Sequence, residues 1–247
     1  MPDRTAPWPR RPRLSPAAHV TPHRTPSGKV RWLATLAPEA AAGYAASVAA
    51  VVPAIEHRLG PAVVADRARP GADGTVRLAP WEPARRRWRT TGGRRLEHTV
   101  RAVVVADVLD CFASIGPAAV TRALADAGAS PEAIDRVVAW LHVLADDGVR
   151  GLPVGPAASA VLGNAVLAGL DEAIERHGVP HLRWVDDVIA FAPSRREARL
   201  ALEGLRRSGA EIGLELHDRK TRIVDDPGEA RALLGRSNSP GAGAGVA

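Results

Sequence analysis

The sequence has almost no cysteine and few aromatic residues. Cys111 is the single cysteine among 247 residues, so no intrachain disulfide can form, as is usual in the reducing cytoplasm. No stretch reaches the ~20 apolar residues of a membrane span, and the start, MPDRTAPWPRRPRLSP, lacks the apolar segment of a signal peptide. We therefore expect a cytoplasmic protein with no membrane partner. Aromatic residues make up only 4%, but hydrophobic residues reach 46%, which is enough for a sizeable core.

Acidic residues are scarce at the N-terminus. In the first thirty residues Asp3 stands alone against six arginine and lysine side chains, and the formal net charge of the chain is +6. A basic surface favours polyanions, most often nucleic acid, although a solvated tail also explains these N-terminal charges. A second basic run, closer to the expected folded part, is a better candidate for phosphate contacts. It comprises Arg85, Arg86, Arg87, Arg89, Arg94 and Arg95.

The two ends of the chain predict disorder. Residues 1–30 are rich in proline, arginine and serine without periodicity, and residues 225–247 end in SNSPGAGAGVA. Residues 38–59 predict a helix that is kinked before Pro53. The stretch 70–100 holds four glycines among short possible strands.

The sequence signals for helices and strands are clearer between residues 101 and 224 than before them. RAVVVADV (101–108) is an apolar, largely β-branched run that ends in an acid, which predicts a buried strand. Helices are expected over 117–128, 131–146, 156–178 and 194–209, and strands over 181–185, 188–192, 213–217 and 221–224. This order favours an α+β fold in which helices cover one face of an antiparallel sheet.

Carboxylates stand at two turning points of this sheet. Asp107 ends a strand, and Asp186-Asp187 form the tip of an expected hairpin. Acids that come together in this way repel unless a cation compensates them, and Mg²⁺ prefers such oxygen ligands. The alternative is a solvated turn, as expected for Asp146-Asp147. The apolar flanks of Asp186-Asp187 favour the metal-binding interpretation.

Four segments resemble, in order, the motifs of reverse transcriptases. VADVLDCFASI (105–115) resembles motif A, and GLPVGPAASAVLGN (151–164) resembles motif B. WVDD (184–187) is similar to motif C, and GLELHDRKTRIV (213–224) is similar to motif D. The resemblance implies a polymerase palm over residues 101–224, preceded by a reduced fingers-like region over 31–100.

The resemblance also implies roles for individual residues. Asp107 and Asp186 are the expected ligands of two Mg²⁺ ions, with Mn²⁺ as a substitute. Asp187 is expected to support them, and the backbone carbonyl of Val108 to add a ligand. Lys220 is expected near the phosphates of the incoming nucleotide. The implied substrate contacts are Phe112 as a steric gate against a ribose 2′-hydroxyl, Pro153 and Gly155 in a loop, and Ser159 and Asn164 on the following helix. Arg67, Arg94 and Arg95 are the expected nucleic-acid contacts of the fingers.

The sequence departs from the common pattern in motif B. Val154 stands where glutamine is usual, and Pro156-Ala157 where Ser-Pro is usual. This form resembles the unknown-group and abortive-infection reverse transcriptases of bacteria, which implies a role in phage defence. Only a short tail follows residue 224, so the helical thumb is expected to be absent. Either a protein or RNA partner takes its place, or the chain is truncated, or activity is limited.

Three hypotheses follow. The first is an RNA-directed, or untemplated, DNA polymerase that uses deoxynucleotides, an RNA template and a DNA primer or product. The second is a degenerate polymerase fold that only binds nucleic acid. The third is another palm-fold enzyme such as a nucleotide cyclase, which the motif B segment and Lys220-Thr221 disfavour.

Overall fold

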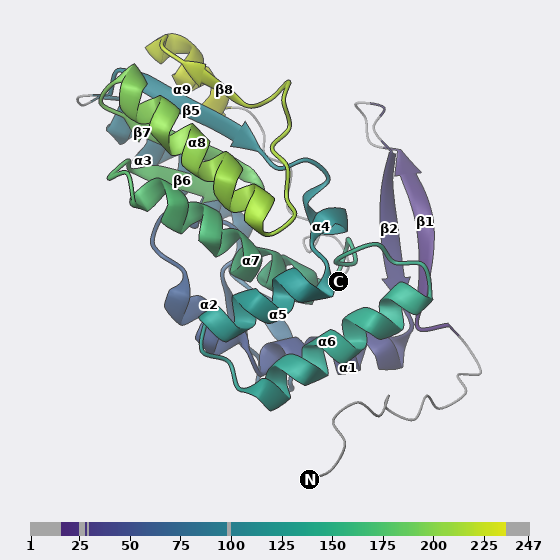
Figure 1. The fold of residues 1–247 in the computed structure, drawn as a ribbon. Coiled ribbons are helices and arrows are strands. Elements are labelled where there is room, and N and C mark those ends of the chain that lie inside the picture. The colour runs from purple at the N-terminus through teal and green to yellow at the C-terminus, as the bar shows by residue number, and fades with distance from the viewer. Residues whose placement is uncertain (1–15, 25–27, 29, 98–99, 236–247) are drawn as a thin grey trace.

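The computed structural model describes residues 16–24, 28, 30–97 and 100–235. Its strands are β1 (Ala18–Arg24), β2 (Val30–Leu36), β3 (Ala68–Pro70), β4 (Val76–Leu78), β5 (Ala102–Asp107), β6 (His181–Trp184), β7 (Asp187–Ala192) and β8 (Arg222–Val224). Its helices are α1 (Pro38–Ala49), α2 (Val52–Arg58), α3 (Trp81–Leu96), α4 (Cys111–Ser114), α5 (Pro117–Asp126), α6 (Pro131–Asp146), α7 (Ala157–Glu175), α8 (Arg195–Glu211) and α9 (Pro227–Gly235). Figure 1 shows the sheet that contains β5 on one side of the molecule and the β1–β2 hairpin on the other.

The central sheet is antiparallel, with strand order β6-β7-β5-β8. Alternate residues of β5 are buried on both faces: Val104 packs into one hydrophobic cluster and Val103 into another. A strand that is covered on both faces needs a continuous apolar run, which is what residues 102–106 provide. The strand expected over 213–217 was wrong in extent, because this segment forms only an isolated bridge between Val108 and Leu216.

Helix α7 forms the centre of the first face, and α5 and α8 pack beside it. Ser194 caps α8 by accepting hydrogen bonds from the backbone N–H groups of Arg196 and Glu197, as expected for an N-cap serine. By length and composition α7 could cross a membrane, but 83% of its apolar window is buried inside the fold. It is therefore a core helix, covered by protein over most of its surface.

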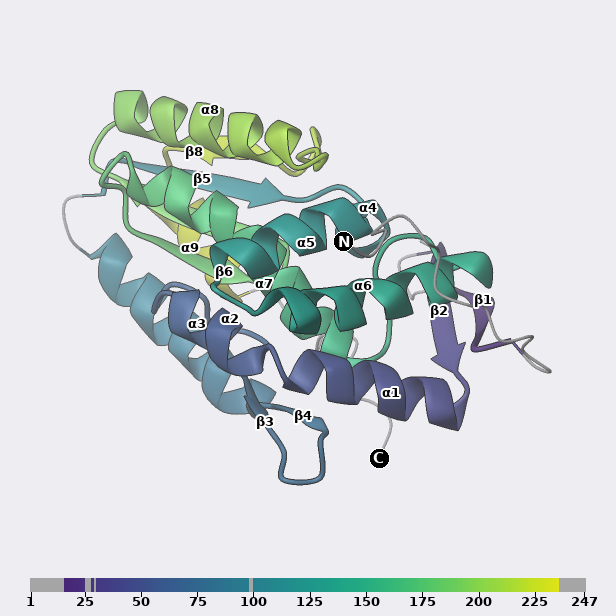
Figure 2. The same cartoon turned by 60° about the horizontal axis from the view of Figure 1, so that its bottom comes forward.

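The second face is also covered, so the expectation of helices on one face was wrong. Helices α3 and α9 pack there against apolar strand residues, and Figure 2 shows α3 and α8 on opposite sides of the sheet. Trp88 of α3 meets Trp184 of β6 edge to face at 6.3 Å. The expected C-terminal disorder over 225–247 is therefore contradicted up to Gly235, and residues 236–247 lie outside the described part.

Short strands expected within 70–100 are confirmed in the β3–β4 hairpin, but helix α3 occupies the stretch from Trp81 to Leu96. This helix contains Pro83, Gly92 and Gly93, which are unfavourable in a helix interior. Pro83 lies in the first turn, where backbone N–H groups have no intrahelical partner. Gly92 lets α9 approach, because a Cβ atom at this position would lie 2.5 Å from Leu234. The helix breakers of the sequence are thus explained by position and packing.

The N-terminal region contains a bent helix pair and two hairpins. Helices α1 and α2 meet at 48°, which confirms the kink expected before Pro53. Strands β1 and β2 pair over their whole length, and β3 and β4 form a shorter hairpin. The disorder expected over residues 1–30 is therefore contradicted for β1, while residues 1–15 lie outside the described part.

Candidate active site

The three expected acids come together at one end of the central sheet. Asp107 ends β5 and lies directly opposite Asp187, which begins β7. Asp186 occupies the tight turn before it, where Val185 adopts a left-handed backbone conformation with φ of 53°. The fold therefore brings together the end of β5 and the tip of the β6–β7 hairpin, which are far apart along the chain.

Burial and mutual repulsion dominate the electrostatics of this cluster. Burial, followed by the charges of Asp186 and Asp107, raises the pKa of Asp187 to about 7. Burial also raises the pKa of Asp186, with Asp107 as the next cause, while Lys220 and Arg31 act in the opposite direction. Strand alternation explains the burial, because Asp107 and Asp187 continue the same sheet face as the apolar side chains Val103, Ile189 and Phe191. The cluster therefore favours added positive charge.

Lys220 supplies one such charge. Its Nζ lies 2.7 Å from Oδ2 of Asp107. Burial lowers the pKa of Lys220, but its hydrogen bond with Asp107 and the nearby carboxylate charges outweigh this effect and raise the pKa overall. The backbone positions the lysine, since His217 N–H donates to the carbonyl of Asp107 at 2.7 Å and Lys220 N–H donates to the carbonyl of His217 at 3.0 Å.

The backbone carbonyl of Val108 points away from the 215–217 segment. The bridge bonds to the 215–217 segment come from Leu109 N–H, at 2.8 Å from the carbonyl of Glu215, and from the carbonyl of Asp107. In an antiparallel pair this leaves the polar groups of Val108 pointing to the other edge of the strand, which is the side of β7. The role of this carbonyl as a metal ligand stays a prediction.

The motif B loop packs against motif A. Leu152 N–H donates to the carbonyl of Phe112 at 2.8 Å. Gly151 has a φ of 61°, and a Cβ atom there would lie 2.3 Å from the same carbonyl oxygen, so only glycine fits. The Phe112 ring is half-buried next to Gly163 of α7, and Pro153 is buried while Gly155 is half-buried. The motif B loop and the segment after Asp107 are thus joined through Gly151, Leu152 and Phe112.

Two expected substrate contacts are instead buried in the core. Ser159 is fully buried and shares a hydrogen bond of 3.1 Å with the hydroxyl of Tyr44. Asn164 is 2% exposed and donates to the backbone carbonyls of Ala65 and Asp66. Both residues hold helix α7 to the N-terminal region, and their contact with substrate stays a prediction.

The expected nucleic-acid contacts are not gathered at the acids. Arg67 binds Glu56 at 2.6 Å and donates to carbonyls at the end of α2, so in this structure it is engaged within the protein. Arg95 lies over the ring of Phe191 at 5.9 Å. Phe191 is four residues beyond Asp187 along β7, which corresponds to about 13 Å. Arg94 is exposed on the same helix, so both arginines lie on α3 away from the acids.

A buried ionic network, which sequence reasoning missed, supports the hairpin tip. Arg183 of β6 is fully buried and binds both carboxylate oxygens of Asp171 on α7, at 2.7 to 3.0 Å. Its Nη1 donates to Asn164 at 2.7 Å and to the carbonyl of Val185 at 3.1 Å. Burial raises the pKa of Asp171, but Arg183 and His181 outweigh it and lower the pKa overall. The position of Arg183 inside an apolar strand was the available signal.

Asp66 is a further acid near the site. Burial raises its pKa, Arg183 opposes this, and the charge of Asp186 raises it further. Its backbone is left-handed, with φ of 52°. A single aspartate in a loop gives no sequence signal of this placement.

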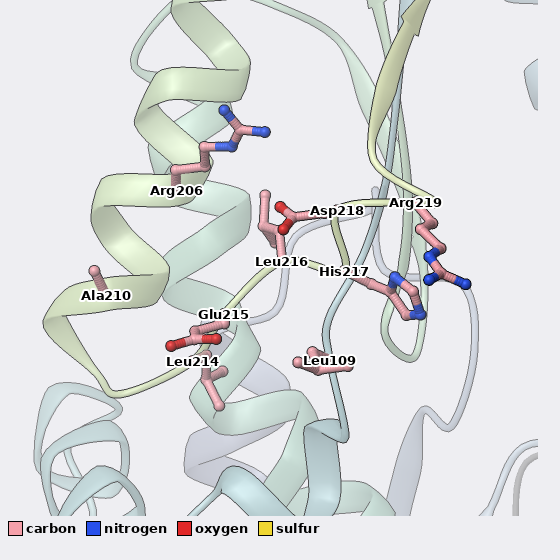
Figure 3. A pocket seen from close by; sticks show the side chains of 9 residues that line it. All are labelled: Leu109, Arg206, Ala210, Leu214, Glu215, Leu216, His217, Asp218 and Arg219. Atoms are coloured by element: carbon pink, nitrogen blue, oxygen red, sulfur yellow. The ribbon is translucent and has the colours of Figure 1, made fainter.

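An open pocket of about 440 Å³ lies beside the motif D segment (Figure 3). Leu109, Leu214 and Leu216 supply its apolar part, while Arg206 and Arg219 add positive charge. It therefore borders the segment that positions Lys220.

The donor set suits a hard divalent cation, because it consists of carboxylate and carbonyl oxygens. Among the described residues, no group of three or more His, Cys, Asp or Glu side chains is arranged to hold a metal ion on its own. Mg²⁺ usually keeps waters and substrate phosphates among its ligands, so an incomplete protein shell is compatible with its binding.

Comparison with known proteins agrees with this geometry. No curated protein matches the sequence. The sequence profile of the family described as reverse transcriptase (RNA-dependent DNA polymerase) matches residues 73–233. This segment exceeds half of the chain, runs from the β3–β4 hairpin into α9 and contains the whole acid cluster. The chain therefore belongs to the reverse transcriptase family and carries a nucleotidyltransferase domain of that class.

Proposed function

We propose that the protein is an RNA-directed DNA polymerase that adds deoxynucleotides by two-metal phosphoryl transfer at Asp107, Asp186 and Asp187. The observation that carries the proposal is the direct pairing of Asp107 with Asp187 across β5 and β7, with Asp186 in the adjoining turn. The family match supports a polymerase activity. The cluster of Asp107, Asp186 and Asp187 lies within the matched residues 73–233.

Asp107, Asp186 and the carbonyl of Val108 would hold the two Mg²⁺ ions, or Mn²⁺. When bound, these ions would activate the primer 3′-hydroxyl and stabilise the leaving pyrophosphate. The protein supplies preorganisation, because the sheet register and the Arg183 contact with Val185 fix the positions of the acids before substrate arrives. Asp187 would support the other acids as a second carboxylate.

Lys220 and the motif A and B residues would handle the nucleotide. Lys220 is 55% exposed along its side chain, so it can turn from Asp107 toward a phosphate. Phe112 would pack against the sugar and favour deoxyribose over ribose by steric exclusion. The backbone at Gly155 would approach the nucleotide and the RNA template closely, since a glycine leaves space there.

The experiment is deoxynucleotide incorporation by the purified chain, with Mg²⁺ or Mn²⁺ and with or without an RNA template and DNA primer. We expect metal-dependent incorporation that Asp107→Ala and Asp186→Ala abolish together. Asp225→Ala, at an exposed acid outside the cluster, is the matched control. Incorporation that survives both changes would refute the site assignment.

The Leu-Pro-Val-Gly-Pro form of residues 152–156 supports a role in phage defence. Cells that express the wild-type protein should resist phage infection, and cells that express Asp186→Ala should not. Equal resistance in both would show that phage defence does not depend on catalysis.

A binding module without catalysis is the second candidate. The observation that favours it is the ion pair of Lys220 with Asp107, which engages one of the expected metal ligands. This candidate predicts salt-sensitive RNA or DNA binding, no incorporation with either metal, and binding that Asp107→Ala leaves unchanged.

A further inference from the structure

An ammonium group lies within the acid cluster. Nζ of Lys220 is 2.7 Å from Oδ2 of Asp107, and the Asp107 side chain is only 10% exposed. The charge of Lys220 also reaches the other two acids, because it acts against the rise in the pKa of both Asp186 and Asp187. The lysine therefore offsets part of the mutual repulsion of the three carboxylates.

Lysine is a rare residue in this chain. Lys29 and Lys220 are the only lysines among the 33 lysine and arginine residues of the sequence. Arginine forms a planar fork that pairs with a carboxylate through two hydrogen bonds, whereas lysine is a compact point charge on a flexible stem. A compact cation resembles a metal ion more closely, and a single hydrogen bond is exchanged more easily for another partner. Lys220 thus suits a contact that forms and breaks.

The backbone around Lys220 is fixed, but its side chain is not enclosed. His217 N–H donates to the carbonyl of Asp107 at 2.7 Å, and Lys220 N–H donates to the carbonyl of His217 at 3.0 Å. These bonds keep the backbones of Lys220 and Asp107 close to each other. The Lys220 side chain is 55% exposed, so its ammonium can exchange Asp107 for water or a phosphate without a change in the fold.

Lys220 and a divalent cation require the same carboxylate. Asp107 is an expected metal ligand, and its Oδ2 accepts a hydrogen bond from the ammonium. Two cations at one carboxylate repel each other, and solvent screens this repulsion less in a partly buried site than in bulk water. The effect is mutual, because a cation that weakens the hold of Asp107 on Lys220 is itself bound more weakly in the presence of Lys220, by the same factor.

We propose that Lys220 holds the place of a divalent cation at Asp107, so that the Lys220–Asp107 ion pair and cation binding exclude each other. The proposal rests on the metal site of the proposed function and adds an order of events to it. The ammonium becomes available to a phosphate only when a cation has replaced it at Asp107. Lys220 thus regulates cation binding, in addition to its expected contact with the nucleotide.

The test is binding of Mn²⁺ to the full chain without nucleotide, measured from the electron paramagnetic resonance signal of the free ion. Lys220→Met removes the charge and the hydrogen-bond donor at similar side-chain length. This variant should bind Mn²⁺ about 5- to 150-fold more tightly than wild type, the range typical of coupled binding. Arg219→Met, at the neighbouring exposed cation (Figure 3), is the matched control and should bind with nearly wild-type affinity. Lys220→Arg keeps the charge and should not gain affinity.

Thermal melting gives a second measure that needs no catalysis. Without metal, Lys220→Met should melt at a lower temperature than wild type, because the acids lose a compensating charge. At one intermediate concentration, Mn²⁺ should raise the melting temperature more in this variant than in wild type, since stabilisation by a ligand grows as its dissociation constant falls. Arg219→Met should follow wild type in both conditions.

Acetylation with detection by mass spectrometry measures the lysine itself. Lys29, the other lysine of the sequence, is the internal reference. Mg²⁺ should speed the labelling of Lys220 relative to Lys29 in wild type, because an amine that has left Asp107 is more open to the reagent. In Asp107→Ala the labelling of Lys220 should already be fast without Mg²⁺.

Equal Mn²⁺ affinity of Lys220→Met and Arg219→Met would overturn the proposal, and so would a gain of affinity in Lys220→Arg. If deoxynucleotides are incorporated and Lys220→Met binds Mn²⁺ no more tightly than wild type, only the role of Lys220 fails. If Lys220→Met binds Mn²⁺ more tightly but wild type incorporates nothing, the polymerase function fails and the role of Lys220 stands. If neither wild type nor Lys220→Met binds Mn²⁺, the metal site fails, and the proposal fails with it.

Discussion

The two faces of the central sheet are stabilised by different means. On the first face, under α7, the strands bury a charged network made by Asp171, His181, Arg183 and Asn164. On the second face, under α3 and α9, they bury an apolar cluster that includes Trp88, Trp184, Phe191 and Leu234. Asp107 and Asp187 continue the second face, but the turn before Asp187 is held from the first through Arg183.

The two kinds of packing contribute differently to the position of the acids and to the stability of the fold. Buried ion pairs often contribute little net stability, because desolvation offsets their attraction, yet they fix geometry. Apolar packing contributes stability with less directional control. The contact of Arg183 with the Val185 carbonyl therefore positions the turn before Asp187. Leu234 instead stabilises the fold by packing against α3.

The largest expected effect comes from breaking the charged network. Arg183→Met leaves Asp171 buried without its partner and should destabilise the protein by about 3–5 kcal/mol. Chemical unfolding measures this loss. The double change Asp171→Leu with Arg183→Met should recover much of the stability but not the incorporation activity, because the Val185 carbonyl has still lost its donor. Recovery of both would show that Arg183 has no positioning role.

A smaller effect is expected from the apolar face. Leu234→Ala removes packing between α9 and α3 and should cost about 2–4 kcal/mol. Incorporation measured well below the melting temperature should stay close to wild type. A loss of activity in the fully folded variant would mean that the second face also positions the acids.

A pH-dependent effect sharpens the comparison. The pKa of Asp187 rises from 3.8 to about 7 on folding, so its stabilising contribution is present below about pH 4 and is lost as pH rises to about 7. Without metal, Asp187→Asn should therefore raise the melting temperature relative to wild type by an amount that grows over this interval and then levels off. A difference that is constant with pH would contradict the burial of this carboxyl.

The sequence predicted the site better than its surroundings. The continuous apolar runs that flank Asp107 and Asp187 mark two buried strands that end at acids, so their meeting could be predicted. Arg67 and Asn164 could not be assigned in the same way, because a polar residue in a loop or helix gives no sign of whether it faces solvent or the core. Gly92 and Leu234 illustrate the converse, since the contact that makes α3 and α9 possible joins residues far apart in the chain.

The central claim is that Asp107 and the Asp186-Asp187 turn share divalent cations. Iron(II) in place of Mg²⁺, with ascorbate and peroxide, cuts the backbone next to a bound metal, and mass spectrometry locates the cuts. The account predicts cleavage both near residue 107 and near residues 185–187, with both cuts lost in Asp107→Ala. Cleavage at one place alone, or at both places in the variant, would contradict it.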